Sequence, residues 1–288
     1  MSKTATISPE QLTTFRKDGF VVIPSVLTDT EVANARSRFE PLFSGNFETG
    51  VQPDEWNWRT GRDDPALTRQ ICNAWKSDRS IASIVLREDI GAACAQLRKW
   101  PGARLNQDNV IWKPPGTKAL GFHQDDSYQD WIVPSEMMTC WITLDDTTVD
   151  QGTIEYVRGS HRWMISPPIQ QFHAPEDPLA DMKLAAQAAG VTPELCPIEV
   201  TAGSAVFHHG RIWHGSRANT GNAPRRSVVA HCMSSDSVFH ETHTSAVYGR
   251  YRQHGSQQMN ESFFPVIWRK DGYRSAWIDD WLKRAAGE

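Results

Sequence analysis

The sequence has no run of about 18 apolar residues, the length that a membrane-spanning helix needs. Its first residues, Met1–Ile7, lead into a polar segment and not into the apolar stretch of a secretion signal. Neither sign of charge is in clear excess, because 30 Lys and Arg stand against 34 Asp and Glu and give a net charge of −4. These absences argue against a membrane protein, a secreted protein and a nucleic-acid-binding protein.

Cysteine is sparse and scattered. The chain has 5 cysteines, an odd number, and no two of them form a C-x-x-C pair. This pattern disfavours a framework of disulfide bonds and favours a reducing compartment. We therefore expect a cytoplasmic location.

Histidine is missing from the N-terminal part of the chain, because all 10 histidines lie at or after His123. Any metal chemistry is therefore expected in the second part of the chain. Tryptophan, in contrast, is abundant, with 12 residues. Two interpretations of this abundance remain open: a broad aromatic cavity, or a core rich in buried indole rings.

The first hundred residues carry mainly helical signals. Ser8-Pro9-Glu10-Gln11 supplies an N-cap, a proline in the first turn and a capping-box glutamine, and Gly19 is expected to end this helix. The other expected elements of this part are a strand over 20–23, a helix from Thr28 to about Phe39, a long loop over 44–66 and a helix over 80–97. The loop over 44–66 is rich in Gly, Asn, Asp and Pro and is expected to cover a site.

From Arg104 onward, short apolar or alternating runs are separated by turn residues, which is typical of β-strands. The expected strands are 104–112, 119–123, 137–145, 153–157, 198–200, 204–208 and 226–233. An inserted loop with one or two helical turns is expected at 173–193, and an amphipathic helix over 275–284 is expected to close the chain. The fold class is therefore mainly β with flanking helices. We expect one domain over 1–288, with a helical support and lid loop in 1–100, a β core in 104–233 and a closing segment in 234–288.

Two histidines and a carboxylate form a candidate metal site. In Phe122-His123-Gln124-Asp125, residues i and i+2 of an extended segment point the same way, so His123 and Asp125 form a two-ligand pair. The best third ligand is His214, on a strand and turn farther along the chain. Such a facial set leaves three coordination positions open, which suits non-haem Fe(II) that must also bind O2 and a bidentate co-substrate. Arg225 and Ser216 would bring a guanidinium and a hydroxyl suited to a carboxylate on that co-substrate.

Several motifs occur in one order along residues 104–233. They are Lys113-Pro114-Pro115-Gly116, Gly121-Phe122-His123-Gln124-Asp125, Cys140-Trp141-Ile142-Thr143-Leu144-Asp145-Asp146, Gln151-Gly152-Thr153-Ile154-Glu155, Gly159-Ser160-His161-Arg162 and His214-Gly215-Ser216 with Asn219 and Arg225. With this ordered set, and with Asp18-Gly19-Phe20-Val21-Val22 near its start, the sequence resembles the phytanoyl-CoA dioxygenase family. These are oxygenases that depend on iron and 2-oxoglutarate and have a double-stranded β-helix, a cupin-like jelly-roll core.

The resemblance implies a set of site residues. Fe(II) would bind His123, Asp125 and His214; the far carboxylate of 2-oxoglutarate would bind Arg225 and Ser216; Trp141 would form a wall of the co-substrate site; and Gln107 and Asn109 would touch 2-oxoglutarate. The last two depend on strand register, because a one-residue bulge would turn them to the other face.

Other residues keep two readings. Trp56, Trp58, Tyr128 and Trp131 either line the substrate pocket or only pack. His208 and His209 are adjacent and point in opposite directions, so at most one faces the site, and we expect both to be structural or to support the ligands. Arg226 is expected to point away from the site, toward solvent or a surface carboxylate.

The expected reaction uses Fe(II), 2-oxoglutarate and O2 to hydroxylate an unactivated C–H bond of a small organic substrate in secondary metabolism. Desaturation, epimerisation and cyclisation use the same chemistry and remain alternatives, whereas Asp125 argues against halogenation because related halogenases carry a small residue there. The sequence has no basic cluster beside the lid loop, so it gives no indication of a coenzyme A site. A zinc hydrolase and a non-catalytic β-helix binding protein are the rival interpretations, and the oligomeric state is left open.

Overall fold

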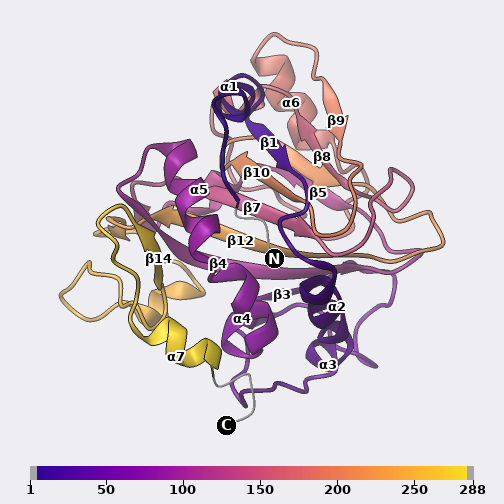
Figure 1. The fold of residues 1–288 in the computed structure, drawn as a ribbon. Coiled ribbons are helices and arrows are strands. Elements are labelled where there is room, and N and C mark those ends of the chain that lie inside the picture. Colours follow the sequence, from indigo (N-terminus) through magenta and orange to yellow (C-terminus); the bar gives the residue numbers. More distant parts are fainter. Residues whose placement is uncertain (1–4, 284–288) are drawn as a thin grey trace.

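A computed structural model describes residues 5–283 of the protein (Figure 1). Its main element is an antiparallel sheet whose strands, from one edge to the other, are β1 (Phe20–Ile23), β10 (Ala205–His209), β7 (Met138–Thr143), β12 (Arg225–Ser234), β4 (Gly102–Lys113), β3 (Arg69–Cys72) and β2 (Glu55–Trp56), with β14 (Val266–Arg269) also paired to β4. A smaller antiparallel sheet contains β5 (Leu120–His123), β11 (His214–Ser216), β8 (Ile154–Val157) and β9 (Leu195–Pro197). A two-stranded ribbon joins β13 (Val238–Phe239) to β6 (Ile132–Val133).

The large and small sheets pack against each other through a cluster of buried side chains. Trp141, Val206 and Val229 of the large sheet belong to the same cluster as Ile154 and Tyr156 of the small one. Alternate residues of a strand point to opposite faces, so the intervening side chains of the large sheet face away from this layer. The two-layer arrangement confirms the expected class, mainly β with flanking helices.

Most of the helices cover the other face of the large sheet, whereas the helix over Ala180–Ala188 packs on the small sheet (Figure 1). The α-helices are α1 (Pro9–Asp18), α2 (Asp29–Ser37), α3 (Phe39–Phe43), α4 (Arg79–Val85), α5 (Glu88–Arg98), α6 (Ala180–Ala188) and α7 (Trp277–Lys283), and the 3-10 helices are η1 (Ala74–Lys76), η2 (Asp125–Tyr128), η3 (Ser160–Arg162) and η4 (Tyr248–Tyr251). Phe39, Ile81 and Ile90 from these helices share the main core with Val110 and Val228 from the sheet. The helical N-terminal part therefore supports the sheet from behind.

The capping signals formed as expected. Ser8 accepts a hydrogen bond from the Gln11 amide while the Gln11 side chain accepts one from the Ser8 amide, which satisfies two free amides at the start of α1. Gly19 ends α1 with φ 87°, a conformation that glycine adopts without steric cost. Thr28 and Glu31 form the same reciprocal box at the start of α2.

Two expected elements are corrected by the structure. The helix expected over 80–97 is broken at Arg87, whose backbone is extended and whose guanidinium binds Asp89 and the carbonyl of Val26, a contact between distant segments. The strand expected at 198–200 lies instead at β9, because the backbone of 198–200 bonds to the side chain of Thr147. The closing helix is α7, and Arg284 of the expected 275–284 range lies outside the described residues.

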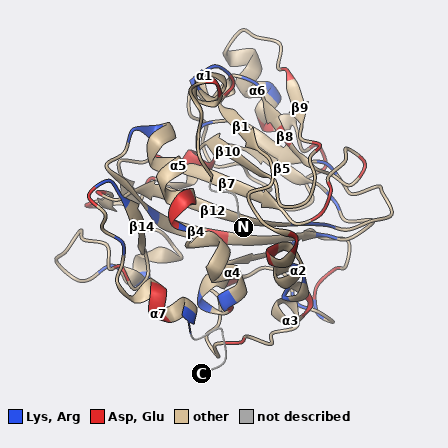
Figure 2. Cartoon of the chain, viewed as in Figure 1, with Lys and Arg blue, Asp and Glu red and all other residues tan. Residues whose placement is uncertain are grey.

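Acidic and basic side chains are interspersed along the described elements (Figure 2), in agreement with the small net charge of −4. None of the helices between residues 5 and 283 combines the length and the apolar character that crossing a membrane requires. The single domain expected over 1–288 stays a prediction.

Candidate metal centre and co-substrate pocket

His123, Asp125 and His214 lie together, and one potential ligand atom from each is within 4.8 Å of the other two. His123 ends β5 and His214 begins β11, and these two residues are direct partners across the small sheet. Asp125 opens η2, two residues after His123. Its Oδ1 lies 3.4 Å from Nε2 of His123 and 3.6 Å from Nε2 of His214. The three atoms can therefore converge on one divalent ion with a face left open.

Backbone carbonyls fix which nitrogen each histidine presents. Nδ1 of His123 lies 2.9 Å from the carbonyl oxygen of Gly121, and Nδ1 of His214 lies 3.0 Å from that of Ile212. Each Nδ1 must carry the proton to donate to a carbonyl, which leaves Nε2 with its lone pair toward the site. Burial lowers the pKa of His214 well below its usual value, so the ring stays neutral and available as a ligand.

The second oxygen of Asp125 is held by two buried side chains. Thr139 Oγ1 donates to Oδ2 at 2.6 Å, and His208 Nε2 lies 3.2 Å from the same atom. Burial alone would raise the pKa of Asp125, but the imidazoles around it, with His208 donating a hydrogen bond, outweigh burial and hold the pKa well below its usual value. Asp125 is therefore an oriented carboxylate, and His208 supports a ligand, as expected of one of the two adjacent histidines.

A chain of hydrogen bonds connects Asp125 to the centre of the large sheet. Because Thr139 donates to Asp125, His231 Nδ1 must donate to Thr139 Oγ1, 2.9 Å away. Asn109 Nδ2 then donates to His231 Nε2, also at 2.9 Å. Asn109 thus acts on the carboxylate through two intermediates. Sequence reasoning did not identify His231, because a lone histidine within an apolar strand carries no motif.

Arg225 is a buried cation without an anionic partner. Its side chain is 2% exposed, and it donates only to the carbonyl oxygen of Gly152, at 3.1 and 3.3 Å, and to Ser227 Oγ at 3.1 Å. No carboxylate between residues 5 and 283 lies within ion-pair distance of it. Burial lowers the pKa of Arg225 to about 10, which still leaves the guanidinium charged at neutral pH. A buried charge of this kind is stable only with an anion beside it.

Lys113 supports the same end of the site. It is the partner of Arg225 across β4 and β12 and is fully buried. Its Nζ donates to the carbonyls of Lys118 and Arg217, at 3.0 and 2.6 Å, and to Ser216 Oγ at 3.2 Å. Since Ser216 accepts from Lys113, its own hydroxyl proton is free to be donated elsewhere. The motif around Lys113 was noticed in the sequence, but its contact with Ser216 was not.

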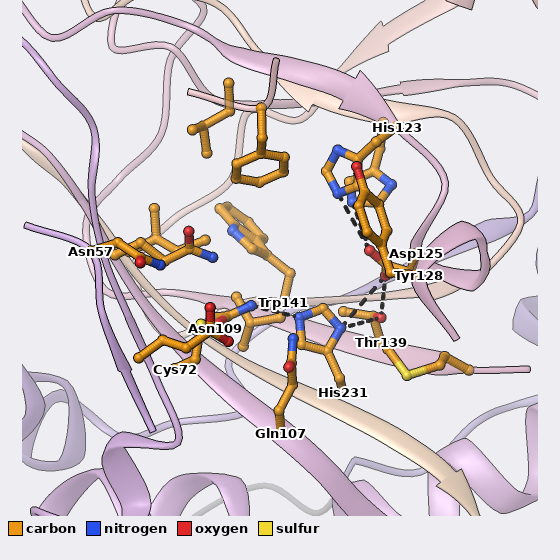
Figure 3. Close-up of a pocket in the computed structure, with 18 of the residues that line it drawn as sticks. Asn57, Cys72, Gln107, Asn109, His123, Asp125, Tyr128, Thr139, Trp141 and His231 are labelled. Carbon is orange, nitrogen blue, oxygen red and sulfur yellow. Dashed lines mark hydrogen bonds and ion pairs between the residues drawn. The ribbon is translucent and has the colours of Figure 1, made fainter. Parts of the chain in front are cut away.

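The triad and Arg225 open into one cavity of about 520 Å³. The predicted residues that line it are His123, Asp125, His214, Arg225, Ser216, Trp141, Gln107, Asn109, Tyr128 and Trp131. Gln107 and Asn109 keep the inward face because the bulge in β4 falls at Asn106, before both of them. The Trp141 ring lies 5.9 Å from Arg225 Cζ. Figure 3 shows the metal-site residues His123 and Asp125 with Tyr128 on one side of the cavity, Asn57, Cys72 and Asn109 on the other, and Gln107, Trp141 and His231 between them.

Trp56 and Trp58 do not line this cavity, which corrects their reading as pocket residues. In β2 the pairing of Glu55 with Cys72 and of Trp56 with Ile71 turns Trp56 toward the helix side of the sheet. There Trp58 is 4% exposed and lies under Arg69, whose Cζ is 3.9 Å from the ring centroid. Their neighbours Glu55 and Asn57 face the cavity instead. The loop 44–66 therefore reaches the site through Glu55 and Asn57, and not through its two tryptophans.

His209 and Arg226 point away from the cavity. His209 lies against Arg98 and stacks on Phe15. Arg226 binds Asp145 in a bidentate pair, at 3.0 and 2.8 Å, as expected of a residue on the outer face of β12.

The comparisons with known proteins agree with this site. The family model described as phytanoyl-CoA dioxygenase (PhyH) matches residues 15–227. An ectoine dioxygenase from Nocardia farcinica is 24% identical over 241 residues, covering 77% of this chain and 76% of that protein. The crystal structure of the non-heme alpha ketoglutarate dependent carbocyclase SnoK from nogalamycin biosynthesis is 25% identical with a TM-score of 0.69, covering 92% of this chain and 99% of that one.

A third similarity concerns fold only. The epimerase SnoN, crystallised with Fe3+, alpha ketoglutarate and nogalamycin RO, is 20% identical with a TM-score of 0.66, covering 90% of this chain and 97% of that chain. These neighbours share the jelly-roll core, which confirms the expected double-stranded β-helix. The expected cofactors, iron and 2-oxoglutarate with O2, are likewise confirmed, because the family match coincides with a His-Asp-His site. The chain belongs to the phytanoyl-CoA dioxygenase family and is a 2-oxoglutarate-dependent dioxygenase.

Proposed function

We propose that this dioxygenase hydroxylates an unactivated C–H bond of a small organic substrate, in secondary metabolism. The observation that carries the proposal is the buried, anion-free Arg225 in the same cavity as the His-Asp-His triad. A dicarboxylate that reaches from the metal to Arg225 satisfies both ends at once. The rest of the cavity remains for the substrate.

We assign the following roles. His123, Asp125 and His214 hold Fe(II), Arg225 and Ser216 bind the far carboxylate of 2-oxoglutarate, and Trp141 forms the wall beside it. When bound, Fe(II) with 2-oxoglutarate and O2 supplies the oxidation of the C–H bond. Thr139 and His208 keep Asp125 in position. Gln107 and Asn109, which line the same cavity, would touch 2-oxoglutarate. Tyr128 and Trp131 border the substrate and keep water from it.

Cyclisation or epimerisation is the second candidate reaction. Its support is the similarity to solved structures described as a carbocyclase and an epimerase. Such reactions need the same metal and co-substrate residues, and they differ in how the substrate lies beside them.

The first test is spectroscopic. Anaerobic protein with Fe(II) and 2-oxoglutarate should give the weak visible charge-transfer band of a chelated 2-oxoacid, which zinc cannot give. Failure to form the band would exclude a 2-oxoglutarate-dependent reaction.

The second test identifies the product. Metabolite extracts are incubated with the active protein or with His214→Ala as control, under isotopically labelled O2. A product that gains one labelled oxygen atom supports hydroxylation, whereas loss of two hydrogens or an unchanged mass supports desaturation, cyclisation or epimerisation.

We also propose a cytoplasmic location, because all five cysteines are free thiols.

A further inference from the structure

The cavity continues away from the triad, along the large sheet, to Glu55. One row of direct strand partners forms this part of its floor: Trp141 on β7, Val229 on β12, Asn109 on β4, Cys72 on β3 and Glu55 on β2. All five line the cavity. Because neighbouring strands lie about 4.8 Å apart, Glu55 is about 14 Å along the sheet from Val229. In Figure 3, Cys72 and Asn109 of this row lie on the opposite side of the cavity from His123 and Asp125. The row ends in the carboxylate of Glu55, the direct partner of Cys72 on the next strand.

Glu55 has neutral neighbours but no cation. Tyr248 Oη lies 3.3 Å from its Oε1 and contacts Gln107 Oε1 more closely, and Cys72 is its direct strand partner. Burial, with smaller contributions from Glu55 and other acidic groups, raises the pKa of both Tyr248 and Cys72 well above their usual values, so both stay protonated. Within residues 5–283, no Lys, Arg or His side chain lies within ion-pair distance of the Glu55 carboxylate.

Two basic side chains bind Asp54, the residue before Glu55, and not Glu55 itself. Lys76 Nζ lies 2.7 Å from Asp54, and Arg250 Nη2 lies 3.0 Å from the same carboxylate. Asp54 does not line the cavity. Tyr251 also donates to Asp54, so these contacts hold the chain next to Glu55 and close to Tyr248. They bring no cation to the Glu55 carboxylate.

The charges of the loaded site point to what Glu55 binds. The cavity is lined by Asp125, Arg225 and Glu55 as its charged groups, apart from histidines. Bound Fe(II) and 2-oxoglutarate cancel each other's charge, and Asp125 and Arg225 do the same. Among the charged side chains between residues 5 and 283 that line the cavity, Glu55 is then the one without a compensating charge. The cavity is partly shielded from water, so opposite charges attract more strongly there than in bulk solvent.

We infer that the substrate carries a cationic nitrogen that pairs with Glu55, at the end of the cavity remote from the metal. This inference rests on the proposed function, because it places the opposite end of the same substrate at the triad. The rings of Trp131 and Tyr248, 5.5 Å apart, stand beside this end and add aromatic faces that favour a cation. An anionic substrate such as a coenzyme A thioester would meet Glu55 without a compensating cation.

The test uses three probes of matched size that differ in charge: phenethylamine, phenethyl alcohol and phenylacetate. Their dissociation constants are measured by NMR titration with the full-length protein, loaded with Zn(II) as a diamagnetic stand-in and with saturating 2-oxoglutarate. We expect the amine to bind about fivefold or more tighter than the alcohol, and phenylacetate to bind most weakly. Glu55→Gln should abolish the preference for the amine.

Glu40→Gln, the same substitution at an exposed position of the nearby α3, is the matched control and should keep the preference. The inference is overturned if the alcohol binds as well as the amine, if the amine does not bind, or if the preference survives in Glu55→Gln. The Fe(II)–2-oxoglutarate charge-transfer band separates the two levels of failure. A normal band with no charge preference refutes only the role of Glu55, whereas a missing band refutes the proposed function itself.

Discussion

Arg225 and Arg226 are adjacent in sequence and face opposite sides of β12. Arg225 is buried without an anion, while Arg226 is neutralised by Asp145 on the outer face. The alternation of side chains along a strand produces this difference from one residue to the next. The pair is therefore an internal control for the co-substrate site, because the same substitution at each position removes the same chemical group.

Arg225→Ala should weaken 2-oxoglutarate binding by about 30-fold to 4,000-fold, because it leaves a buried carboxylate unpaired at a cost of about 2–5 kcal/mol. Arg226→Ala should change the same dissociation constant by no more than a few fold. Titration of the charge-transfer band with 2-oxoglutarate measures both. Damage in Arg226→Ala alone would show that the strand register is wrong, and damage in neither would show that the co-substrate binds elsewhere.

Three histidines should respond differently to replacement by alanine. His214→Ala removes a ligand and should abolish tight iron binding. His208→Ala removes a contact to Asp125 Oδ2 and should weaken iron binding by about 10-fold to 100-fold. His209 lies outside the cavity, so His209→Ala should leave the iron affinity unchanged. Equilibrium dialysis under anaerobic conditions gives the three affinities, and equal iron affinity in the His208 and His209 variants would contradict the support of Asp125 by His208.

At the scale of single elements, local signals predicted what depends on local structure. The caps of α1 and α2, the core strands and the His123–Asp125 pair follow from residues a few positions apart. Contacts between distant segments were not predictable in this way. Arg87 breaks the expected long helix through its bond to Val26, and Tyr248 reaches the cavity from a segment expected only to close the chain.

The segment from Glu55 to Trp58, which begins with β2, provides a direct test of which side chains face the cavity. Trp58→Ala should lower the free energy of unfolding by about 3–5 kcal/mol, because it removes a buried ring from the core, and should leave 2-oxoglutarate affinity intact. Asn57→Ala, at an exposed position that lines the cavity, should have little effect on stability and should alter substrate binding. Chemical denaturation and substrate titration distinguish them, and a reversed result would place the tryptophans in the cavity after all.

At the scale of the whole molecule, the metal ligands are attached to both sheets. His123 and His214 face each other across β5 and β11, while Asp125 is tied through Thr139 to the large sheet. A bound ion therefore links the two layers. Any ligand that binds only the folded state must stabilise it.

Fe(II) with 2-oxoglutarate, added anaerobically at about 100 times their dissociation constants, should each contribute up to about 2.7 kcal/mol and raise the unfolding midpoint by several degrees. In Arg225→Ala the rise caused by Fe(II) should persist while the further rise from 2-oxoglutarate is lost. Differential scanning fluorimetry records both steps. An identical response in the native protein and in the Arg225 variant would show that 2-oxoglutarate does not bind at Arg225.

The two ends of the cavity are built from different parts of the chain. The oxidation machinery lies on β5, η2, β7, β11 and β12, whereas the end remote from the metal is built from β2 and β3, within residues 55–72, together with Trp131 and Tyr248. Selection on that N-terminal segment can therefore alter which molecule is accepted without disturbing how it is oxidised. The fold is modular in this sense, and exchange of residues 44–72 between relatives tests whether the accepted substrate changes while the oxidation does not.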